Sequence, residues 1–559
     1  MRITLPASRP SAKPDPDSPK TLYPVPLYIR RGITVKYDIL IENGRVIDGA
    51  GNPWFRADVG IVGDRIKAIG ILEDATGDRR IDASGLVVSP GFIDIHSHSD
   101  YNVLIDPMVQ SKVRQGVTTE VVGMCGGSAA PMNAEVRAYR EKYMRARLGD
   151  DFEFDWSTMG GYMDRVNASG TSFNLVPIVG HGTVRQNVMG YENREPSSSE
   201  LDEMKELVDG AMVDGAWGMS TGLIYIPGVY SKTDELIELV RVLPKYGGVY
   251  FSHIRGEGAT LFESVEEAIT IGREAGVPVQ IAHFKASGKE HWGKTAESLR
   301  LVEEGRESGV DVTFDQYPYI ASSTGLSSYL PAWVQEGGAD KLLERISDPE
   351  TRAKISTEPT RIAGDWSSVM VSSAKGHTQY EGKMIVEVAE IEGKSEMDTV
   401  FDLLIAENAQ VSVVSFGISE EDVRRVMASP FGMVGSDGSA VSPEGILGKG
   451  KPHPRFYGTF PRVIGHYVRE GVLNLQEAVR KMTSAPAQRL GMWDRGIIKE
   501  GFKADVTVFD PERVNDEATF VDPHRYASGI PYVIVNGTVV VDGGEHTGAL
   551  PGRALKKSL

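Results

Sequence analysis

The chain is poor in several features that mark particular classes of protein. It has a single cysteine, Cys125, so no internal disulfide can form and the fold does not depend on an oxidising compartment. No apolar run reaches the roughly 18 residues that a membrane-spanning helix needs, and residues 1–33 lack the apolar core of a secretory signal. The net charge is −17 and no long cluster of Lys and Arg occurs, which argues against a phosphate-backbone partner. We therefore expect a cytoplasmic protein that binds neither membrane nor nucleic acid.

Strand-like segments occur at both ends of this 559-residue chain. Tyr37–Asp48 and Asp58–Ile69 alternate apolar and polar residues around Asn43-Gly44 and Gly63-Asp64, dipeptides typical of tight hairpins. Short strand-like segments also occur near the other end, at residues 504–509, 532–536 and 539–541. We predict a small β-sandwich domain assembled from both termini, residues 34–88 and 491–559, with residues 1–33 as an N-terminal extension.

Between these ends, eight mostly apolar stretches alternate with segments that are mainly helical in pattern. The stretches are Leu86–His98, Val117–Cys125, Phe173–His181, Ala216–Tyr225, Gly248–His253, Val277–His283, Val310–Tyr317 and Phe431–Asp437. Nearly continuous apolar runs are typical of parallel strands buried on both faces. They predict an α/β fold, a (β/α)8 TIM barrel over residues 89–490. The connection from Tyr319 to Pro430 is too long for a simple crossover, so we expect an insertion between strands 7 and 8, at about residues 325–425.

Side chains that can bind metal gather at the ends of these strands. In such barrels the chemistry lies at the carboxyl ends of the strands, and there the sequence has His96, His98, Cys125, His253, His283 and Asp437. Only 11 histidines occur in the whole chain, so this concentration is not expected by chance. His96 and His98 stand two residues apart and face the same side of one strand, where two imidazoles can bind one ion.

Six such groups exceed what one tetrahedral zinc uses, and they suffice for two ions that share a bridging thiolate. Each residue alone also fits an ordinary structural role: a lone buried cysteine usually behaves as a small hydrophobe, and Asp437 could cap a turn. His181, between Gly180 and Gly182, is equally well interpreted as a hydrogen-bonded structural residue or as a catalytic one. The joint arrangement at successive strand ends favours metal, and we predict zinc.

Several motifs resemble those of the amidohydrolase superfamily. Residues 90–98, Pro-Gly-Phe-Ile-Asp-Ile-His-Ser-His, resemble its first-strand signature, and residues 494–505 resemble its usual return into the β domain. Many members bridge two metals with a carboxylated lysine on the fourth strand, but here that strand ends in Ser220–Tyr225, without a lysine. Cys125 offers a replacement, and this substitution is similar to the D-aminoacylase (N-acyl-D-amino-acid deacylase) family. The block His453–Arg462 adds to this resemblance, which covers roughly residues 36–553.

The resemblance implies how the metal ligands divide. The tighter zinc would be held by Cys125, His253 and His283. A second, weaker site would share Cys125 and add His96, His98 and Asp437.

The resemblance also implies the residues that meet the substrate. Arg455 would bind a carboxylate, for which its planar guanidinium is suited. Lys285 and Tyr317, at or just beyond the ends of strands six and seven, would contact the substrate's polar groups. Arg255 fits such a contact and fits a structural ion pair with Glu257 equally well.

These roles predict a zinc-dependent hydrolase that cleaves the amide bond of an N-acyl-D-amino acid, giving a carboxylate and a free D-amino acid. Asp437 would take the proton of a zinc-activated water and deliver it to the leaving amine, with Tyr317 or Tyr225 as a donor to the oxyanion. The D configuration comes from the resemblance alone. Leu330 and Trp333 fit either an apolar side-chain pocket or the core of the insertion, and acidic side chains remain open.

Two other interpretations stay open at this point. The first keeps the fold and changes the bond, as in a cyclic amidase of the hydantoinase or dihydroorotase type, or a dipeptidase. The missing fourth-strand lysine and Arg455 weigh against it. The second is a non-catalytic binding or assembly protein on the same scaffold, against which the complete set of ligands weighs. The sequence does not indicate an oligomeric state.

Overall fold

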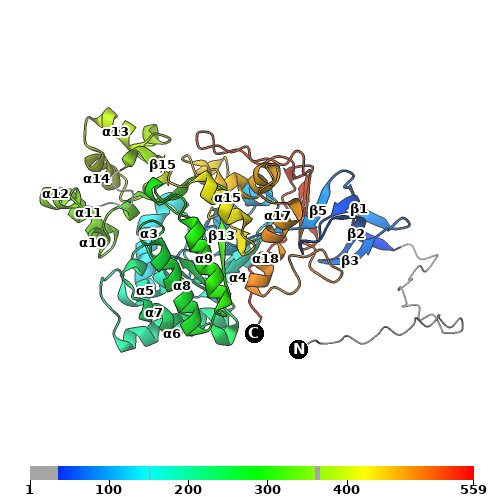
Figure 1. The fold of residues 1–559 in the computed structure, drawn as a ribbon, viewed down its shortest axis with the longest axis horizontal. Coiled ribbons are helices and arrows are strands. Elements are labelled where there is room, and N and C mark those ends of the chain that lie inside the picture. The colour runs from blue at the N-terminus through cyan, green and yellow to red at the C-terminus, as the bar shows by residue number, and fades with distance from the viewer. Residues whose placement is uncertain (1–34, 150, 359–364, 559) are drawn as a thin grey trace, which may run out of the picture.

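The computed structural model describes residues 35–149, 151–358 and 365–558, so the predicted extension at residues 1–33 lies outside the described residues. In Figure 1 the helices of an insertion lie at one end of the molecule, the N-terminal strands lie at the other, and a barrel lies between them. Within the described part of the chain, no helix has both the length and the apolar character needed to cross a membrane.

The barrel consists of eight parallel strands, with a short break in the third. They are β6 (Phe92–Asp94), β7 (Val117–Val122), β8 (Asn174–Pro177) continued by β9 (Val179–Gly180), β10 (Gly218–Gly222), β11 (Val249–His253), β12 (Val279–Ile281), β13 (Val312–Gln316) and β17 (Gly432–Val434). The ring closes beyond β17, where the Asp437 amide donates to the His96 carbonyl at 2.8 Å and the His98 amide donates to the Gly438 carbonyl at 2.8 Å. The predicted (β/α)8 barrel is confirmed.

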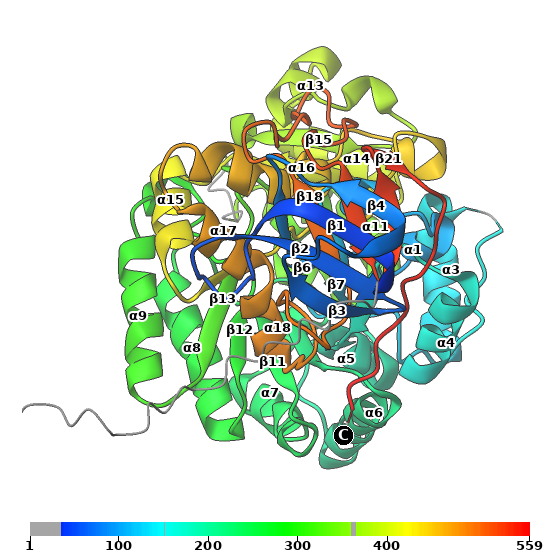
Figure 2. The same ribbon diagram turned by 90° about the vertical axis from the view of Figure 1, so that its right-hand side faces the viewer.

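Helices follow the strands and cover the outside of the barrel, as the helical patterns predicted. Figure 2 shows α6 (Ser198–Asp214), α7 (Thr233–Val240), α8 (Leu261–Ala275) and α9 (Thr295–Glu307) in succession around it. The start of α6 has a capping box, in which Ser197 and Glu200 satisfy each other's backbone amides. Its end is set by Gly215, whose positive φ of 113° suits glycine. The other helices of the barrel section are α1 (Asn102–Ile105), α2 (Gln110–Val113), α3 (Ala134–Leu148), α4 (Met159–Ser169), α5 (His181–Met189), α15 (Glu420–Ala428), α16 (Arg455–Arg462), α17 (Leu475–Met482) and α18 (Ser484–Leu490).

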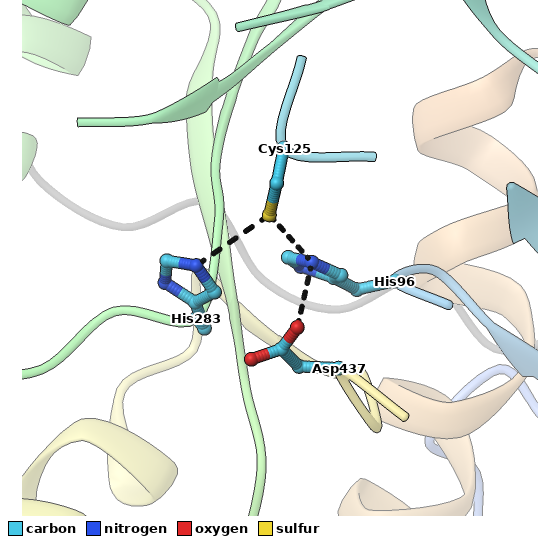
Figure 3. A group of neighbouring side chains, drawn as sticks. All are labelled: His96, Cys125, His283 and Asp437. Carbon is cyan, nitrogen blue, oxygen red and sulfur yellow. Dashed lines mark hydrogen bonds and ion pairs between the residues drawn. The ribbon is translucent and has the colours of Figure 1, made fainter. Parts of the chain in front are cut away.

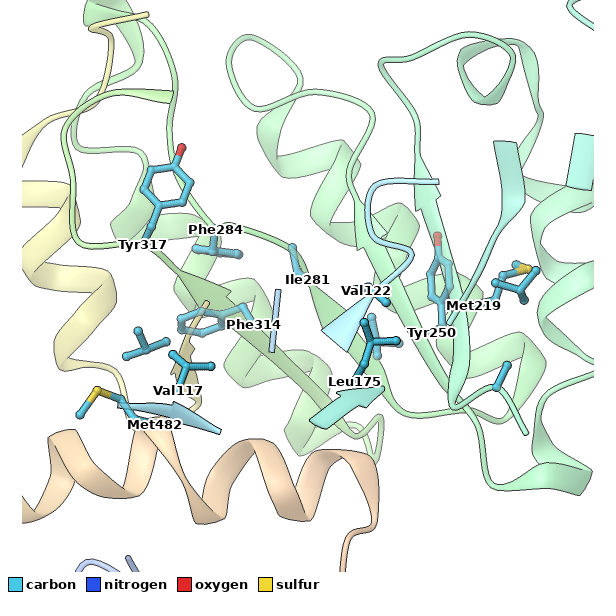
Figure 4. Close-up of a cluster of buried hydrophobic side chains, with 14 of the residues drawn as sticks. Val117, Val122, Leu175, Met219, Tyr250, Ile281, Phe284, Phe314, Tyr317 and Met482 are labelled. Carbon is cyan, nitrogen blue, oxygen red and sulfur yellow. The ribbon is translucent and has the colours of Figure 1, made fainter. Parts of the chain in front are cut away.

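Both faces of the strands are buried, which explains their nearly continuous apolar sequences. Val122 and Leu175 belong to the large cluster of buried side chains drawn in part in Figure 4. Their immediate neighbours Val121 and Val176 belong to a different cluster. Successive side chains of a strand point to opposite faces, so the two clusters fill the two sides of the barrel wall.

Strands from both termini form one sheet, as predicted for the β domain. The N-terminal part contributes β1 (Lys36–Val46), β2 (Phe55–Val62), β3 (Arg65–Gly70), β4 (Thr76–Asp82) and β5 (Val87–Pro90); the C-terminal part contributes β18 (Val506–Phe509), β19 (Tyr532–Val535), β20 (Thr538–Asp542) and β21 (Glu545–His546). The strand order is β21-β20-β19-β18-β5-β1-β2-β3, with β4 paired to β1, and the two parts join where β5 pairs antiparallel with β18. The strands therefore belong to one continuous hydrogen-bonded sheet.

The two predicted hairpins have different outcomes. Gly63-Asp64 does connect β2 and β3. The hairpin around Asn43-Gly44 is wrong, because β1 runs through both residues and its register against β2 shifts between Ile41 and Gly44. Asn43 has a φ of 62°, and a positive φ serves a β-bulge as well as a turn. Sequence alone does not distinguish the two uses of this dipeptide.

The insertion between β13 and β17 has a core of its own. It contains β14 (Ser322–Gly325), β15 (Val369–Ser373) and β16 (Ser412–Ser415), with α10 (Ala332–Gln335), α11 (Ala339–Ser347), α12 (Pro349–Ile355), α13 (Ile385–Glu392) and α14 (Glu396–Ala406). Leu330 lies in its hydrophobic core and Trp333 packs against that core. These two side chains therefore serve the packing of the insertion, one of the two roles left open for them.

Candidate metal centre

Cys125 lies between histidines from opposite parts of the barrel mouth. Its Sγ is 3.4 Å from Nε2 of His96 and 3.7 Å from Nε2 of His283. Figure 3 shows these side chains with Asp437, whose Oδ1 is 3.4 Å from Nε2 of His96. Ligand atoms of all four residues lie within 4.8 Å of one another, close enough to share an ion.

The two remaining predicted ligands border the same group. Nε2 of His98 is 3.0 Å from Oδ1 of Asp437, and Nδ1 of His253 is 2.8 Å from Nε2 of His283. Nε2 of His253 is buried and has no hydrogen-bond partner among the described residues. The fold thus brings together all six side chains that the sequence predicted as metal ligands.

The backbone at three of these residues is strained. Cys125, His283 and Asp437 have positive φ values of 53°, 34° and 47°, in a region that non-glycine residues rarely adopt. Each such residue costs of the order of 1–3 kcal/mol, and this kind of strain concentrates at functional sites. Figure 3 shows the side chains of these three residues pointing toward one another.

The electrostatics of the group favour anionic donors. Burial acts to raise the pKa of Cys125, but the charge of His96 and contacts with His253 and His283 outweigh it and hold that pKa well below its usual value. Burial likewise acts to raise the pKa of Asp437, and Arg455 and His96 together lower it well below its usual value. A thiolate and a carboxylate in one buried group need positive charge, which protons on histidine or a divalent cation can supply.

Carboxylates that sequence reasoning missed orient the histidines. Oδ1 of Asp315 lies 2.9 Å from Nδ1 of His96 and also accepts the backbone amide of His283 at 2.8 Å. Oε1 of Glu257 lies 3.0 Å from Nδ1 of His283. A carboxylate behind a ligating imidazole fixes its tautomer and its orientation. Asp315 stands at the end of β13, and Glu257 stands four residues after His253. These positions in the sequence were the features from which a role beside the histidines could have been predicted.

Three residues predicted to contact the substrate form a second group beside the first. Nη1 of Arg455 is 3.0 Å from Oδ2 of Asp437, and its guanidinium carbon is 4.6 Å from the centre of the Tyr317 ring. Nζ of Lys285 is 5.7 Å from the same ring centre and pairs with Glu257. The buried hydroxyl of Tyr317 has no hydrogen-bond partner among the described residues. Two ion-paired cations and a hydroxyl therefore lie next to the predicted metal ligands.

The other two predicted contacts lie differently. The Tyr225 ring centre is 5.2 Å from that of His253, and its hydroxyl lies 3.0 Å from Oγ1 of Thr324 on β14, so Tyr225 borders the site. Arg255 does not reach it, because its guanidinium binds both carboxylate oxygens of Glu267. The alternative prediction, an ion pair of Arg255 with Glu257, is also wrong, because Glu257 contacts Lys285 and His283 instead.

Two cavities open on the metal-ligand group. A cavity of about 180 Å³ is lined by His253, His283 and Lys285, and one of about 520 Å³ is lined by His98, Cys125 and Arg455. Both reach Asp437, and the insertion strand β14 contributes to both. The main chain of β14 also accepts a hydrogen bond from Nη2 of Arg455, at Ser323. The insertion therefore forms part of the walls of the site.

A family model described as "Amidohydrolase family" matches residues 79–541. The chain belongs to this amidohydrolase family. Among curated relatives, it is similar to D-aminoacylase of Alcaligenes xylosoxydans xylosoxydans, with 38% identity over 93% of this chain and 98% of the relative. It is also similar to N-acyl-D-glutamate deacylase of the same organism, with 37% identity over 93% of this chain and 97% of the relative. The crystal structure of N-acyl-D-glutamate deacylase from Bordetella bronchiseptica, complexed with zinc and a phosphonate inhibitor, has a TM-score of 0.79, 33% identity, and coverage of 93% and 100%.

In this amidohydrolase, packing excludes a long side chain at the end of the fourth strand. A Cβ placed on Gly222 would lie only 2.0 Å from the Cys125 carbonyl oxygen, so the exits of β7 and β10 are pressed together. No lysine could stand there without moving the Cys125 loop. The resemblance to D-aminoacylases, which was predicted from Cys125 and the missing lysine, is confirmed.

Proposed function

We propose that this amidohydrolase hydrolyses the acyl amide bond of N-acyl-D-amino acids, with zinc as its metal. The observation that carries the proposal is the direct ion pair of Arg455 with Asp437, which places a carboxylate-binding cation beside the metal-ligand group. The names of the two relatives, D-aminoacylase and N-acyl-D-glutamate deacylase, support the linear N-acyl substrate and its D configuration. The zinc in the Bordetella bronchiseptica enzyme supports the choice of metal.

The donor set fits zinc. A donor set of thiolate and imidazoles binds zinc in preference to hard cations such as Mg²⁺. Nε2 of buried His253, which has no hydrogen-bond partner among the described residues, adds a nitrogen donor. Cys125, His253 and His283 would hold the tighter ion, and His96, His98 and Asp437 with Cys125 would form the second site. When bound, zinc supplies a water of lowered pKa and polarises the amide carbonyl.

Asp437 acts as the general base and then the general acid. Its lowered pKa keeps it ionised, so it can accept a proton from the attacking water. As the water oxygen bonds to the carbonyl carbon and the C–N bond breaks, Asp437 returns this proton to the leaving nitrogen. Arg455 and Lys285 hold the carboxylate of the amino acid. The hydroxyl of Tyr317, which has no hydrogen-bond partner in the described part of the chain, donates to the oxyanion. We also infer a cytoplasmic location, because the site depends on one reduced thiol, Cys125.

Parallel assays of zinc-loaded protein test the proposal. We expect turnover of N-acetyl-D-amino acids and little turnover of their L enantiomers, of hydantoins, of dihydroorotate or of dipeptides. Asp437→Asn should lower kcat by roughly 10²–10⁴-fold and leave most of the zinc bound. Asp202→Asn, at an exposed position on α6, is the matched control for charge. Preferred turnover of the cyclic amides, or normal activity in Asp437→Asn, would contradict the proposal.

A further inference from the structure

The larger of the two cavities is well suited to a part of the substrate that the proposed roles leave unplaced. An N-acyl amino acid extends in two directions from the scissile carbonyl: the amino acid on the nitrogen side and the acyl group on the carbon side. The proposed roles provide for the carboxylate and the reacting atoms, and not for the acyl group. The cavity of about 520 Å³ reaches His98, Cys125 and Asp437, so a group inside it would join directly to a carbonyl held at the metal ligands.

The geometry of the barrel assigns the two halves of the substrate to opposite sides. Around the ring, β12 and β13 are the sixth and seventh strands and carry Lys285 and Tyr317 just beyond their ends. The second and third strands, β7 and β8–β9, lie across the barrel from them. In the closed ring of eight, three strands lie between the second and the sixth in either direction, and three between the third and the seventh. The cavity extends from Arg455 and Asp437 over this opposite side, where Met124 and Gly127 after β7 and Gly182 and Gln186 after β9 line it. With the amino acid over β12 and β13, the acyl group must extend over β7 and β9.

The far wall of this cavity is aromatic and apolar. Tyr139 and Met144 of α3 and Tyr191 after α5 form it, with the rings of Tyr139 and Tyr191 centred 5.1 Å apart. Met124 lines it nearer to Cys125. Aromatic and thioether side chains adapt to flat rings and to flexible aliphatic chains. The wall therefore offers a surface for an apolar group.

Two polar side chains on the side of the cavity near Tyr139 and Tyr191 are already held by the protein, while Arg455 lines the cavity beside Asp437. Arg140 donates to the main-chain carbonyls of Ser128 and Ala129, at 2.9 and 2.7 Å. Gln186 donates to the hydroxyl of Tyr191 at 2.8 Å. A charged group placed against this wall would have to break these contacts, whereas an uncharged apolar group would leave them intact.

We propose that this cavity, which we term the acyl pocket, binds the acyl group, and that the preferred substrates carry a large uncharged acyl group, arylacetyl or medium-chain aliphatic, instead of acetyl. The inference rests on the proposed function and extends it to the substrate class. The size of the acyl pocket supports the proposal. Its volume of about 520 Å³ lies within the roughly 300–1,000 Å³ of pockets that enclose drug-sized ligands, and an acetyl group would leave most of this volume empty. The cavity of about 180 Å³ on the Lys285 side is left for the amino-acid side chain.

A series of D-leucine derivatives tests the acyl pocket, with acetyl, hexanoyl, octanoyl and phenylacetyl groups on one amino acid. We expect kcat/KM to rise at least about tenfold from acetyl to the best large acyl group, since a single methylene in a fitted pocket already changes it by roughly 10–200-fold. Gly127→Phe should plug the pocket and reverse this preference. Gly127 has an ordinary φ, and a Cβ there would meet no atom closer than 3.9 Å, so the backbone accepts a side chain. Gly210→Phe, at an exposed position of α6 with open space around it, is the matched control and should keep the wild-type preference.

Tyr139→Ala gives an independent test in the opposite direction, because removing part of the far wall should shift the optimum to a longer acyl chain. The inference would be overturned by equal kcat/KM values across the acyl series. It would also be overturned if Gly127→Phe changed the preference for the side chain of the amino acid and left the preference for the acyl group unchanged. Binding of phenylacetate to the zinc-loaded protein, measured by calorimetry, separates the two proposals. If no N-acyl-D-amino acid is cleaved, the proposed function fails. The acyl pocket is still supported if phenylacetate binds the wild-type protein and Gly127→Phe abolishes this binding. If phenylacetate does not bind the wild-type protein, the acyl pocket is refuted.

Discussion

At the scale of single residues, the site depends on charges that face one another in a buried space. Asp437 lies between His98 and Arg455, so one carboxylate contacts both a predicted metal ligand and the residue proposed to bind the substrate's carboxylate. Changing either partner therefore affects both substrate binding and proton transfer. Ratios between matched substrates can separate the two effects, because they cancel whatever a substitution does to Asp437.

Arg455→Gln tests carboxylate recognition in this way. Removing one partner of a buried charge pair costs about 2–5 kcal/mol, so kcat/KM for N-acyl-D-leucine should fall at least about 30-fold. The wild-type protein should strongly prefer this acid over its carboxamide, and the variant should lose the preference. Arg462→Gln, on the same helix and paired with Asp516, is the control. A preference that persists in Arg455→Gln would place the carboxylate elsewhere.

Asp315→Asn tests the residue behind His96. The loss of this charge should weaken zinc binding or activity by about 10–100-fold, as is typical when the carboxylate behind a ligating histidine is changed. Competition with a chelator of known affinity measures the zinc dissociation constant. Asp311→Asn, four residues earlier with a mostly exposed side chain, provides the control. Equal zinc affinity in both variants would limit Asp315 to a role in folding.

At the scale of elements, a buried cluster of three polar side chains joins two helices of the barrel section. His181 and Arg185 on α5 both contact Oε1 of Glu235 on α7, at 2.9 and 3.1 Å. His181 was left open between a structural and a catalytic role, and this arrangement favours the structural one. The side chain of Arg185 is completely buried, so the Glu235 carboxylate is needed to balance it.

Glu235→Gln should lower the free energy of unfolding by about 3–5 kcal/mol, because it leaves a buried cation without its partner. Burial acts to raise the pKa of Glu235, but His181 and Arg185 outweigh it and lower that pKa below 4.5. A lowered folded-state pKa contributes stability that is present above pH 4.5 and lost as pH falls through the folded pKa. Urea unfolding at several pH values should show this loss in the wild type and not in Glu235→Gln. Glu297→Gln, in an exposed ion pair with Arg300, should change stability little. Parallel pH profiles of wild type and Glu235→Gln would refute the argument.

At the scale of the whole molecule, the six predicted metal ligands connect distant parts of the chain. They come from the ends of β6, β7, β11, β12 and β17, so one site fastens five strands across the mouth of the barrel. The β17 exit is also where the ring closes, through the hydrogen bonds of His96 and His98 with residues 437–438. A bound ion would therefore stabilise the closure of the fold as well as the chemistry.

Zinc should raise the midpoint of thermal unfolding for this reason. A ligand that binds only the folded state stabilises it by about 2.7 kcal/mol at 100 times its dissociation constant. Scanning calorimetry with increasing free zinc should show the shift, and a chelator should reverse it. Mg²⁺ should have little effect, since it prefers oxygen ligands. An unchanged midpoint in zinc for the wild type, or an equal shift in Cys125→Ser, would contradict this assignment of ligands.

The sequence by itself determined the strands and the ligand types. Apolar runs of strand length, helical periodicity between them and a polar residue at each exit are local patterns, and they predicted all eight barrel strands. Because parallel strands bring their carboxyl ends to one face, the six ligand-type residues had to meet once the barrel was identified. Cys125 and the missing fourth-strand lysine indicated the family for the same local reason.

Only the tertiary structure decided which partner each group meets. Arg255 pairs with Glu267 and not with Glu257, Asn43-Gly44 forms a bulge inside β1, and Asp315 and Glu257 stand behind the histidines. The acyl pocket and the Arg455–Asp437 pair join residues that are far apart in the chain. Contacts of this kind depend on how separate loops pack over the barrel mouth, which periodicity and spacing along the chain do not encode.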